Sequence, residues 1–490
     1  MASLDEIRDD RLKKLELLKK KMNPYPSSSH YDFTIKDALA SFSKLKGKKK
    51  PIFLVGRVFS LRKQGGLIFF HFNDGTGSFQ GLLKKNEVSK DIFFLFDETI
   101  DVGDFIECGG IFFTTKRGEI TLLVSQWKIL AKSLRSLPDK WHGIKDVEER
   151  FRRRYLDVLM MPEAKDRFTM RTRTIKEIRA FLDKEGFVEV ETPVLQPLYG
   201  GASAEPFTTH HRALDMKLYL RISDELYLKR LLVGGFPKVY ELSKNFRNEG
   251  IDATHYPEFT MLEWYEAYSN AKQQMILVEK LLKTLVKKLL NKNCLFRGKE
   301  KIDFSLKFKV VSYYELLKRY ALILFPEDAT HEELMLKAQQ LAVPVEHSET
   351  NVKILDNIYK KVCRPKIIQP TFIVDYPVDY LPLAKKKEGS ETTTDAFQLV
   401  IGGLELVKAF SELNDPTDQR IRFLKQEESQ IKGDREAQRL DEDFLEALEY
   451  GMPPAGGVGI GIDRLVMLFT DTLNIKEVIL FPSMKPKEEP

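Results

Sequence analysis

The chain has 490 residues, of which 43% are hydrophobic and 31% are charged, and this composition predicts a globular protein of two or three domains. It contains no apolar run long enough to span a bilayer, and residues 1–21 mix acidic and basic side chains, so we expect neither a membrane protein nor a signal peptide. Three widely spaced cysteines argue against a disulfide framework or a zinc knuckle and predict a cytoplasmic setting, while the net charge of +6 leaves a nucleic-acid partner open.

The N-terminal part, residues 1–50, is rich in basic side chains. Residues 4–22 have the spacing of a basic amphipathic helix, which a proline-containing turn at 23–26 ends. Residues 44–50 form a lysine-rich linker. Both segments suit either a solvated face or a contact with RNA phosphates, and such a contact would make binding depend on salt.

Residues 51–132 have the pattern of a small β-barrel. Five short strands in so short a segment are typical of an OB fold. Barrels of this kind bind single-stranded nucleic acid with exposed aromatic rings and polar groups. Residues 133–150 follow as a polar hinge. The strands of the barrel are expected at 52–58, 67–72, 78–83, 105–113 and 119–125.

Residues 151–490 alternate helices and strands with hairpin-like turns, so we predict the α+β class, with an antiparallel sheet flanked by helices. Helices are expected at 168–186 and 271–291, and a strand is expected at 189–195. The last residues, 485–490, are expected to be a frayed tail.

Two segments of this domain predict a nucleotide site. In the first, Arg247 and Glu249 stand two residues apart in a strand-like run, so both side chains are expected on one face, and His255 and Phe259 follow. In the second, spaced glycines lead to Arg464, with no room for the second βαβ unit of a dinucleotide fold. Taken alone, an Arg-x-Glu pair is usually a surface ion pair and a glycine run is usually a turn. Together they predict flat groups that hold a purine and two guanidinium ions that clamp a polyphosphate.

The two segments resemble motifs 2 and 3 of the class II aminoacyl-tRNA synthetases, and residues 219–265 resemble the bacterial-type lysine–tRNA ligases in particular. The resemblance covers about residues 53–482. It implies an OB-fold anticodon-binding domain at 51–132 and a class II catalytic domain with an antiparallel sheet at 151–490. It also implies a homodimer through motif 1, which falls within 168–195, and ATP, Mg²⁺, lysine and tRNA as ligands.

By this resemblance, Arg247 and Arg464 are the catalytic residues. Arg247 contacts the α-phosphate and the incoming carboxylate, and Arg464 stacks on adenine and reaches the γ-phosphate. Phe259 covers the other face of the base, Glu249 accepts a hydrogen bond from the adenine amino group, and His255 assists the β- and γ-phosphates. The implied ATP-binding residues are Arg247, Glu249, His255, Tyr256, Phe259, Glu405, Gly461 and Arg464.

A metal ion is expected because ATP arrives with magnesium and a carboxylate usually helps to hold it. The implied metal ligands are Glu405, Gln398 and Glu412. The family has an acid at position 398, and the glutamine here brings no negative charge, so fewer or differently held ions are expected. A regular strand would face Glu405 and Glu412 apart, and a β-bulge after the turn at 402–403 would reconcile them.

A lysine substrate requires anionic partners for its ammonium groups and room for an aliphatic stem. The resemblance implies that Glu412 and Tyr265 hold the ε-ammonium and that Phe410 lines the stem. Lys408 stands where the family has asparagine, and it either repels the substrate ammonium or, as we expect, contacts the substrate carboxylate or a phosphate. The implied lysine-binding residues are Gly201, Glu225, Arg247, Glu263, Tyr265, Lys408, Phe410 and Glu412.

In the barrel, the resemblance implies anticodon contacts by Arg62, Phe69, Gln80 and Glu119, although a phenylalanine in such a strand serves the core equally well. The implied reaction joins lysine to the 3′ end of its tRNA through a lysyl-adenylate, so no side-chain nucleophile is required. Three alternatives remain: lysyl transfer to a protein acceptor, against which the barrel argues; a tRNA-binding paralogue with weak catalysis; and a ligase for aspartate or asparagine, which would leave carboxylates buried and unpaired.

Overall fold

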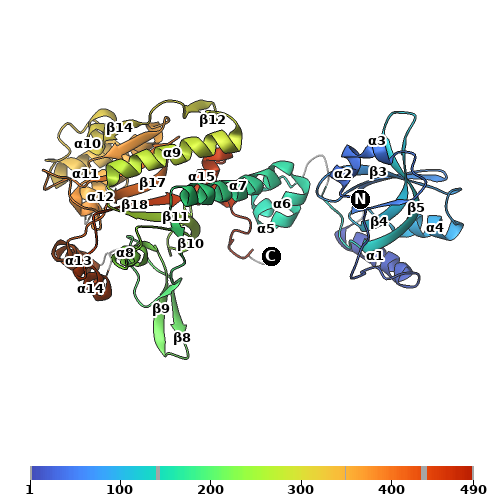
Figure 1. Ribbon diagram of the computed structural model, residues 1–490, viewed down its shortest axis with the longest axis horizontal. Coiled ribbons are helices and arrows are strands. Elements are labelled where there is room, and N and C mark those ends of the chain that lie inside the picture. Colours follow the sequence, from blue (N-terminus) through green and yellow to red (C-terminus); the bar gives the residue numbers. More distant parts are fainter. Residues whose placement is uncertain (1–2, 139–143, 348, 432–438, 488–490) are drawn as a thin grey trace. The chain divides into compact units, whose positions relative to one another are not determined.

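The computed structural model describes residues 3–138, 144–347, 349–431 and 439–487. It divides into two compact units, Met1–Lys145 and Asp146–Pro490 (Figure 1). None of the described helices is both long enough and apolar enough to cross a membrane. The predicted hinge includes residues 139–143 and the predicted tail includes 488–490, which lie outside the described residues.

The first unit is a closed barrel in which the strands follow the order β1-β2-β3-β5-β4, so the OB-fold prediction is confirmed. Two strands are longer than the sequence indicated: β1 pairs first with β4 and then with β2, and β5 pairs with β4 along residues 120–131. The strands are β1 (Ile52–Gln64), β2 (Leu67–Asn73), β3 (Ser78–Lys84), β4 (Phe105–Thr114) and β5 (Ile120–Ala131).

Helix α4 (Lys90–Thr99) lies between β3 and β4 and was not predicted. Its N-cap is Ser89, whose hydroxyl accepts a hydrogen bond from the backbone N–H of Ile92, and its aromatic residues Phe93 and Phe96 are buried in the barrel core. The run of apolar residues in this helix is too short for its period to be read from the sequence.

The N-terminal segment belongs to the barrel unit. Helix α1 (Leu4–Lys19) starts at a capping box formed by Ser3 and Glu6 and ends three residues before the predicted boundary. Its basic side chains are partly engaged within the unit: buried Arg11 donates to the carbonyls of Val102, Ser133 and Arg135, and Lys14 pairs with Asp101 at 2.9 Å. Short helices α2 (Ile35–Ala40) and α3 (Phe42–Leu45) follow.

The second unit is built on an eight-stranded sheet in the order β14-β15-β16-β17-β18-β11-β10-β6. The five inner strand pairs are antiparallel, and the pair at each edge is parallel, which confirms the α+β prediction. The strands are β6 (Val188–Glu189), β10 (Lys238–Phe246), β11 (Glu258–Ala267), β14 (Lys309–Ser312), β15 (Thr371–Val374), β16 (Ala396–Ile401), β17 (Leu404–Ser411) and β18 (Ala455–Gly461).

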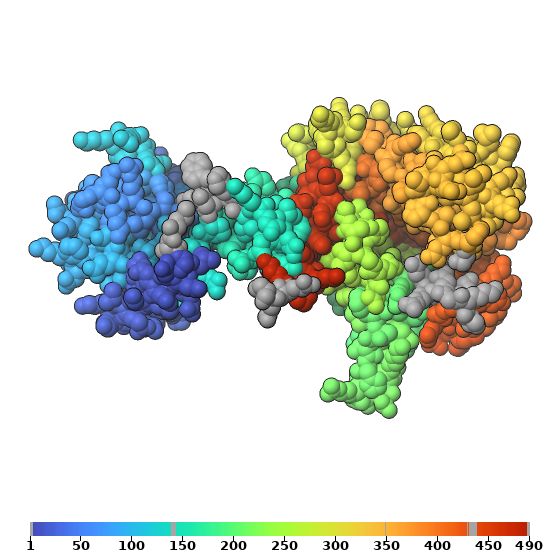
Figure 2. Space-filling view, turned by 180° about the vertical axis from the view of Figure 1, so that it is seen from behind, coloured from blue at the N-terminus to red at the C-terminus, as the bar shows by residue number. Residues whose placement is uncertain are grey.

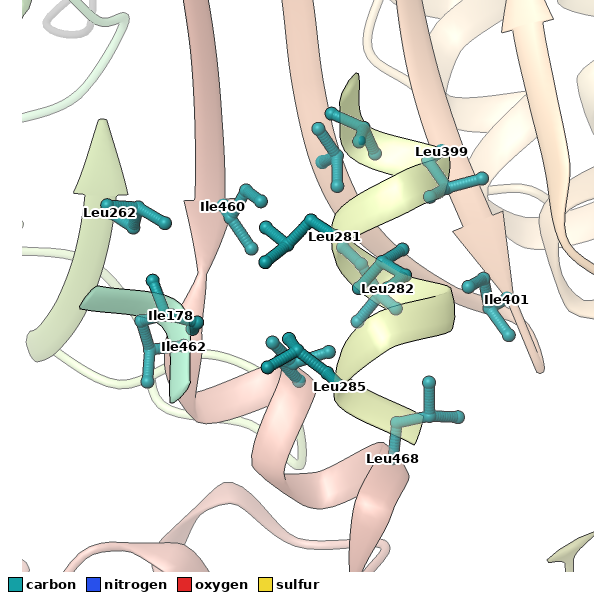
Figure 3. Packing of buried hydrophobic residues seen from close by; sticks show 14 of the residues in the cluster. Ile178, Leu262, Leu281, Leu282, Leu285, Leu399, Ile401, Ile460, Ile462 and Leu468 are labelled. Atoms are coloured by element: carbon teal, nitrogen blue, oxygen red, sulfur yellow. The ribbon is translucent and has the colours of Figure 1, made fainter. Parts of the chain in front are cut away.

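One face of this sheet is buried by α7 (Pro162–Lys184), α9 (Ala271–Leu290) and α15 (Ile462–Phe469). Helix α9, predicted within one residue, is capped by Asn270 and ends at Asn291, whose φ of 53° is left-handed. Its leucines meet Leu399 and Ile401 of β16 and Ile460 of β18 (Figure 3). Each fully buried leucine contributes about 1.5–3 kcal/mol, so this apolar layer fixes which face of the sheet is left for polar side chains.

The predicted strand at 189–195 is only partly formed, since only its two ends pair. In its middle, the N–H and the hydroxyl of Thr192 both donate to Glu241, and Pro193 has no N–H to give to a ladder. Strands β8 (Thr208–His211) and β9 (Met216–Leu220) form a hairpin that protrudes from this unit (Figure 2).

The remaining elements of the second unit are short. They are α5 (Val147–Arg152), α6 (Arg154–Met160), β7 (Leu195–Gln196), α8 (Glu225–Val233), β12 (Cys294–Arg297), β13 (Glu300–Asp303), α10 (Tyr313–Leu316), η1 (Leu317–Ala321), α11 (His331–Gln340), α12 (Asn351–Ile358), η2 (Tyr359–Cys363), η3 (Arg364–Lys366), η4 (Val378–Tyr380), α13 (Pro416–Ile431), α14 (Glu442–Glu449) and η5 (Ile475–Val478).

Asp463 at the start of α15 connects three elements of the second unit, because it accepts hydrogen bonds from Arg171 of α7 at 2.6 Å and from the N–H of Thr260 of β11 at 2.7 Å. Asp463→Ala leaves both donors without this partner, so we expect the free energy of unfolding to fall by about 3–5 kcal/mol in urea denaturation followed by circular dichroism. The matched control is Lys288→Ala on α9, which removes an exposed ion pair with Glu177 of α7. It should lower the free energy of unfolding by less than about 1 kcal/mol. Equal losses for the two variants would contradict this account.

Candidate active site

The polar face of the sheet collects most of the predicted site residues. Glu263 lies opposite Gly459, Gly459 opposite Lys408, and Lys408 opposite Gln398. The next row along the strands holds Tyr265, Gly457 and Phe410. Because side chains alternate between faces, these residues point away from the apolar layer formed by α7 and α9.

The expected β-bulge is present in β17. The register between β16 and β17 shifts between Leu399 and Val400, which leaves Leu406 as the extra residue. The bulge brings Glu405 to the face that also bears Lys408, so the two side chains belong to one site.

Glycine at position 457 makes room for a carboxylate in the middle of the sheet. A Cβ atom there would overlap Oε1 of Glu412 and would come within 2.5 Å of the Tyr265 ring. Gly201, at a φ of 84°, lets its loop approach Ser223 and Glu225, since a Cβ would lie 2.9–3.0 Å from their side chains. The spaced glycines therefore belong to β18 and the site, and not to a dinucleotide loop.

Arg247 and Glu249 do not lie in a strand, and that prediction is wrong. Strand β10 ends at Phe246, and the Arg247 N–H donates to the carbonyl of Pro257 across the loop that leads to β11. The guanidinium of Arg247 lies 5.0 Å from the centre of the Phe259 ring, and its buried Nε has no hydrogen-bond partner among the described residues. Glu249 is exposed.

Arg464, in the first turn of α15 after the N-cap Gly461, joins this loop to β17. Its guanidinium donates to the carbonyls of Thr254 and Glu405 at 3.2 and 3.1 Å and approaches Nε2 of His255 at 2.8 Å. Partial burial and the charge of Arg464 lower the pKa of His255, so a neutral ring can accept this hydrogen bond at Nε2.

Glu405 is surrounded by cations. Arg364 of η3 lies 3.5 Å from its carboxylate, and the positive charges of Arg464, Arg364 and Lys408 outweigh the effect of burial and hold the pKa of Glu405 below its usual value. Arg364 was not predicted, because the sequence around it carries no pattern that would connect it to the nucleotide segments.

Three buried carboxylates gather at the opposite end of the site. Glu263 accepts hydrogen bonds from the Tyr265 hydroxyl at 3.0 Å and from the Ser223 hydroxyl at 2.9 Å. Glu225, the first residue of α8, and Glu412, just after β17, both contact the buried ammonium of Lys229.

Lys229 is a second site residue, after Arg364, that the sequence analysis missed. Its Nζ lies 2.5 Å from Glu225, forms an ion pair with Glu412, and is 5.4 Å from the centre of the Phe410 ring. The spacing of four residues between Glu225 and Lys229 on one helix face was the available signal.

The carboxylates outnumber the one buried ammonium. Burial raises the pKa of Glu412 to about 8, with Lys229 opposing and Glu225 adding to the shift. Burial, with the negative charges of Asp224 and Glu225, also raises the pKa of Glu263 well above its usual value. Oε1 of Glu412 has no hydrogen-bond partner among the described residues. A cationic ligand would stabilise the ionised carboxylates at this end.

Two predictions are not matched by this arrangement. The side chain of Tyr256 lies in the apolar core and accepts a hydrogen bond from the N–H of Ser483, so it faces away from the nucleotide residues. Glu405, Gln398 and Glu412 do not form one metal site, because Glu412 pairs with Lys229 at the other end and Gln398 accepts from the hydroxyl of Tyr376 at 2.8 Å. Within the described ranges, no three His, Cys, Asp or Glu side chains are grouped to hold a metal.

The four predicted anticodon residues lie on one outer face of the barrel. Arg62 and Phe69 are opposite each other in β1 and β2, and Phe69 alternates with residues that are buried in the core. Buried Gln80 accepts a hydrogen bond from Thr121, and exposed Glu119 lies 2.9 Å from His71.

Comparisons with known proteins agree with both units. Residues 146–485 match the family described as tRNA synthetases class II (D, K and N), and residues 52–130 match the OB-fold nucleic acid binding domain. A lysine–tRNA ligase of Carboxydothermus hydrogenoformans is 46% identical over 99% of both chains. A lysine–tRNA ligase of Pelotomaculum thermopropionicum is 47% identical over 99% of this chain and 96% of its own, and one of Aquifex aeolicus is 47% identical over 90% and 74%.

The raised pKa of Glu412, about 8, predicts a pH-dependent stability. The folded protein holds this proton more tightly than the unfolded chain, whose carboxyl has a pKa of about 4.3, so the stability that the proton contributes is full at low pH and is lost as the pH rises through 8. Glu412→Gln has no such proton. Its free energy of unfolding relative to wild type should therefore increase from about pH 5 to pH 8 in urea denaturation. For the exposed control Glu258→Gln on β11, the difference in free energy of unfolding from wild type should not change with pH. The same constant difference for Glu412→Gln would refute the raised pKa of Glu412.

Proposed function

The chain belongs to the class II lysine–tRNA ligases, and we propose that the polar face of β11, β18 and β17 is where lysine and ATP react to give lysyl-adenylate. The enzyme then joins the lysyl group to the 3′ end of tRNA. The observation that supports this site is its division into two ends, with the cations Arg247 and Arg464 at one end and the buried carboxylates Glu225, Glu263 and Glu412 at the other. Free lysine carries the complementary pattern, with two ammonium groups and one carboxylate.

At the cationic end, the carboxylate of lysine attacks the α-phosphorus of ATP and pyrophosphate leaves. Negative charge develops on the phosphoryl oxygens, and preorganised guanidinium groups stabilise it. We assign this role to Arg464 and to Arg247, whose buried Nε has no hydrogen-bond partner in the part of the chain that the structure describes. Phe259, already in contact with the Arg247 guanidinium, supplies the flat surface for adenine, and Glu249 accepts from the adenine amino group.

His255 and Gly461 complete the nucleotide end. His255 is neutral beside Arg464 and so adds no repulsion between cations, and its Nδ1–H, which lies 2.8 Å from Asp252, can donate to a phosphate oxygen once it leaves that partner. Gly461 lies at the N-cap of α15, where the absence of a side chain leaves the backbone open next to Arg464. Tyr256 lies in the same loop, but its ring packs in the apolar core, so we assign it no contact with ATP.

At the carboxylate end, Glu412 and Tyr265 hold the ε-ammonium, and Phe410 packs on the aliphatic stem. Glu225, Glu263 and the carbonyl of Gly201 receive the α-amino group. Lys229 keeps part of the negative charge neutralised in the free enzyme. A neutral or acidic amino acid would leave at least one buried carboxylate without its counter-ion, at a cost of several kcal/mol, which disfavours aspartate and asparagine.

The transfer step needs no side-chain nucleophile, because the terminal ribose hydroxyl of tRNA attacks the adenylate carbonyl. We propose that the anticodon is read on the barrel face that bears Arg62, Phe69, Gln80 and Glu119. We further propose a cytoplasmic homodimer whose interface includes α7 and the segment up to residue 195. Transfer of lysine to a protein acceptor and a weakly catalytic paralogue receive no support from the comparisons.

Amino-acid-dependent pyrophosphate exchange without tRNA tests the adenylate step. Among the standard amino acids, lysine alone should support exchange, because it alone matches the paired carboxylates and cations. Arg247→Ala and Arg464→Ala each remove a preorganised cation and should lower the exchange rate by about 10²–10³-fold. The control Arg420→Ala, which breaks an exposed pair with Glu442, should retain the wild-type rate. Exchange with another amino acid, or with none, would overturn the proposed function.

The barrel assignment predicts a separation of tRNA binding from adenylate formation. Phe69→Ala should weaken tRNA binding by about 1–3 kcal/mol through the loss of one stacking ring, with lysine-dependent exchange unchanged. The control Phe94→Ala removes an exposed ring on α4 of the same unit and should bind tRNA normally. Binding is measured by filter retention at one fixed salt concentration, since the phosphate contribution varies with salt. Equal effects of the two variants would contradict the assignment.

A further inference from the structure

Glu405 lies in surroundings that disfavour a second cation. Arg364 already lies 3.5 Å from its carboxylate, the Arg464 guanidinium donates to its backbone carbonyl, and the positive charge of Lys408 also acts on it. A divalent ion added here would gain one carboxylate and would meet three fixed positive charges. Like charges a few ångströms apart in a partly buried site repel strongly, so the protein side of this position is unsuited to Mg²⁺.

Gln398, the residue opposite Lys408, does not compensate. Its side-chain oxygen is the only atom that could ligate a metal, and it accepts a hydrogen bond from the buried hydroxyl of Tyr376. The hydroxyl donates this hydrogen bond at 2.8 Å, so the amide oxygen of Gln398 is already engaged. The neutral amide therefore binds Tyr376, and it brings no negative charge that would help to hold Mg²⁺.

Lys408 is positioned for an anion. Its side chain is accessible, its Nζ lies 5.5 Å from the centre of the Tyr380 ring, and across the described ranges it takes part in no ion pair. The ring itself is fixed, because Tyr380 stacks on Tyr376 and donates to Asp356 at 2.9 Å. An ammonium held over an aromatic face and left with open donors can bind a phosphate or carboxylate oxygen.

We propose that Lys408 and Arg364 supply, as fixed charges, the neutralisation of the ATP phosphates that a protein-held Mg²⁺ would otherwise supply beside Glu405. This inference rests on the proposed function and deepens it. Magnesium then enters only as a counter-ion of ATP, without side-chain ligands from this site. The departures at 398 and 408 are linked in this way. The neutral glutamine removes a metal ligand, and the lysine supplies the positive charge that the metal ion would have supplied.

The test is the affinity of a non-hydrolysable ATP analogue, measured by calorimetry on the full chain with excess EDTA or with excess Mg²⁺. Wild type should lose no more than about threefold in affinity without metal. Lys408→Asn and Arg364→Gln should each lose about tenfold or more in EDTA, as expected for one charged hydrogen bond, and regain part of that in Mg²⁺. The control Lys366→Gln removes an exposed charge from the same turn as Arg364 and should behave as wild type.

A second readout counts metal ions directly. Mn²⁺ is titrated and the bound ions are counted by electron paramagnetic resonance. The number of Mn²⁺ ions bound per enzyme–analogue complex should not exceed the number bound by the free analogue. The double variant Gln398→Glu/Lys408→Asn, which restores an acid and removes the ammonium, should bind at least one further ion. Loss of wild-type affinity by tenfold or more in EDTA, or an equal loss by Lys408→Asn in both buffers, would overturn the inference and leave the proposed function intact. Absence of analogue binding under every condition would instead overturn the proposed function.

Discussion

The burial of one face of the sheet is the constraint on which the whole site depends. Leu262 and Trp264 of β11 and Ile460 of β18 are completely buried under α7, α9 and α15. Because neighbouring residues in a strand point to opposite faces, this burial commits Glu263 and Tyr265 to the other side. A register slip of one residue would exchange carboxylates for leucines and would be opposed by the entire apolar layer. The hydrophobic core therefore positions charged side chains that it never touches.

Two local irregularities then turn a flat polar face into a site. The bulge at Leu406 re-aims Glu405 toward Lys408. Glycine at 457 leaves the volume that the Glu412 carboxylate occupies. The bulge interrupts the register of β17, and the missing side chain at 457 leaves a gap in the row of side chains on β18. The irregular positions are the functional ones, as expected where a fold departs from its own local rules.

The sequence predicted the parts of this arrangement that follow from periodicity. The barrel strands, helix α9 and the shared face of Glu263 and Tyr265 are set by local patterns, and the bulge followed from the wrong parity of Glu405. The errors have another cause. The loop conformation of Arg247 depends on a hydrogen bond to Pro257, and Arg364 reaches Glu405 from the turn η3, more than a hundred positions after Arg247 along the chain. Contacts between residues that are not neighbours in a helix or strand leave no periodic pattern in the sequence. The resemblance to a motif indicates which residues are functional, but it does not give their conformation.

The two ends of the site explain how the substrate is oriented as well as how it is bound. Lysine has a cationic group at each end of its stem and an anionic group beside one of them. Glu225 and Glu412 contact Lys229, and burial raises the pKa of Glu412 and of nearby Glu263, so these two carboxyls ionise most readily when a cationic ammonium group binds beside them. Arg247, Arg464 and Lys408 gather toward the other end, so a lysine bound in reverse would place its carboxylate against carboxylates. Charge alone therefore directs the substrate carboxylate toward the α-phosphate. Lys229 allows this end of the site to fold without substrate, because Glu225 and Glu412 buried without a counter-ion would be costly.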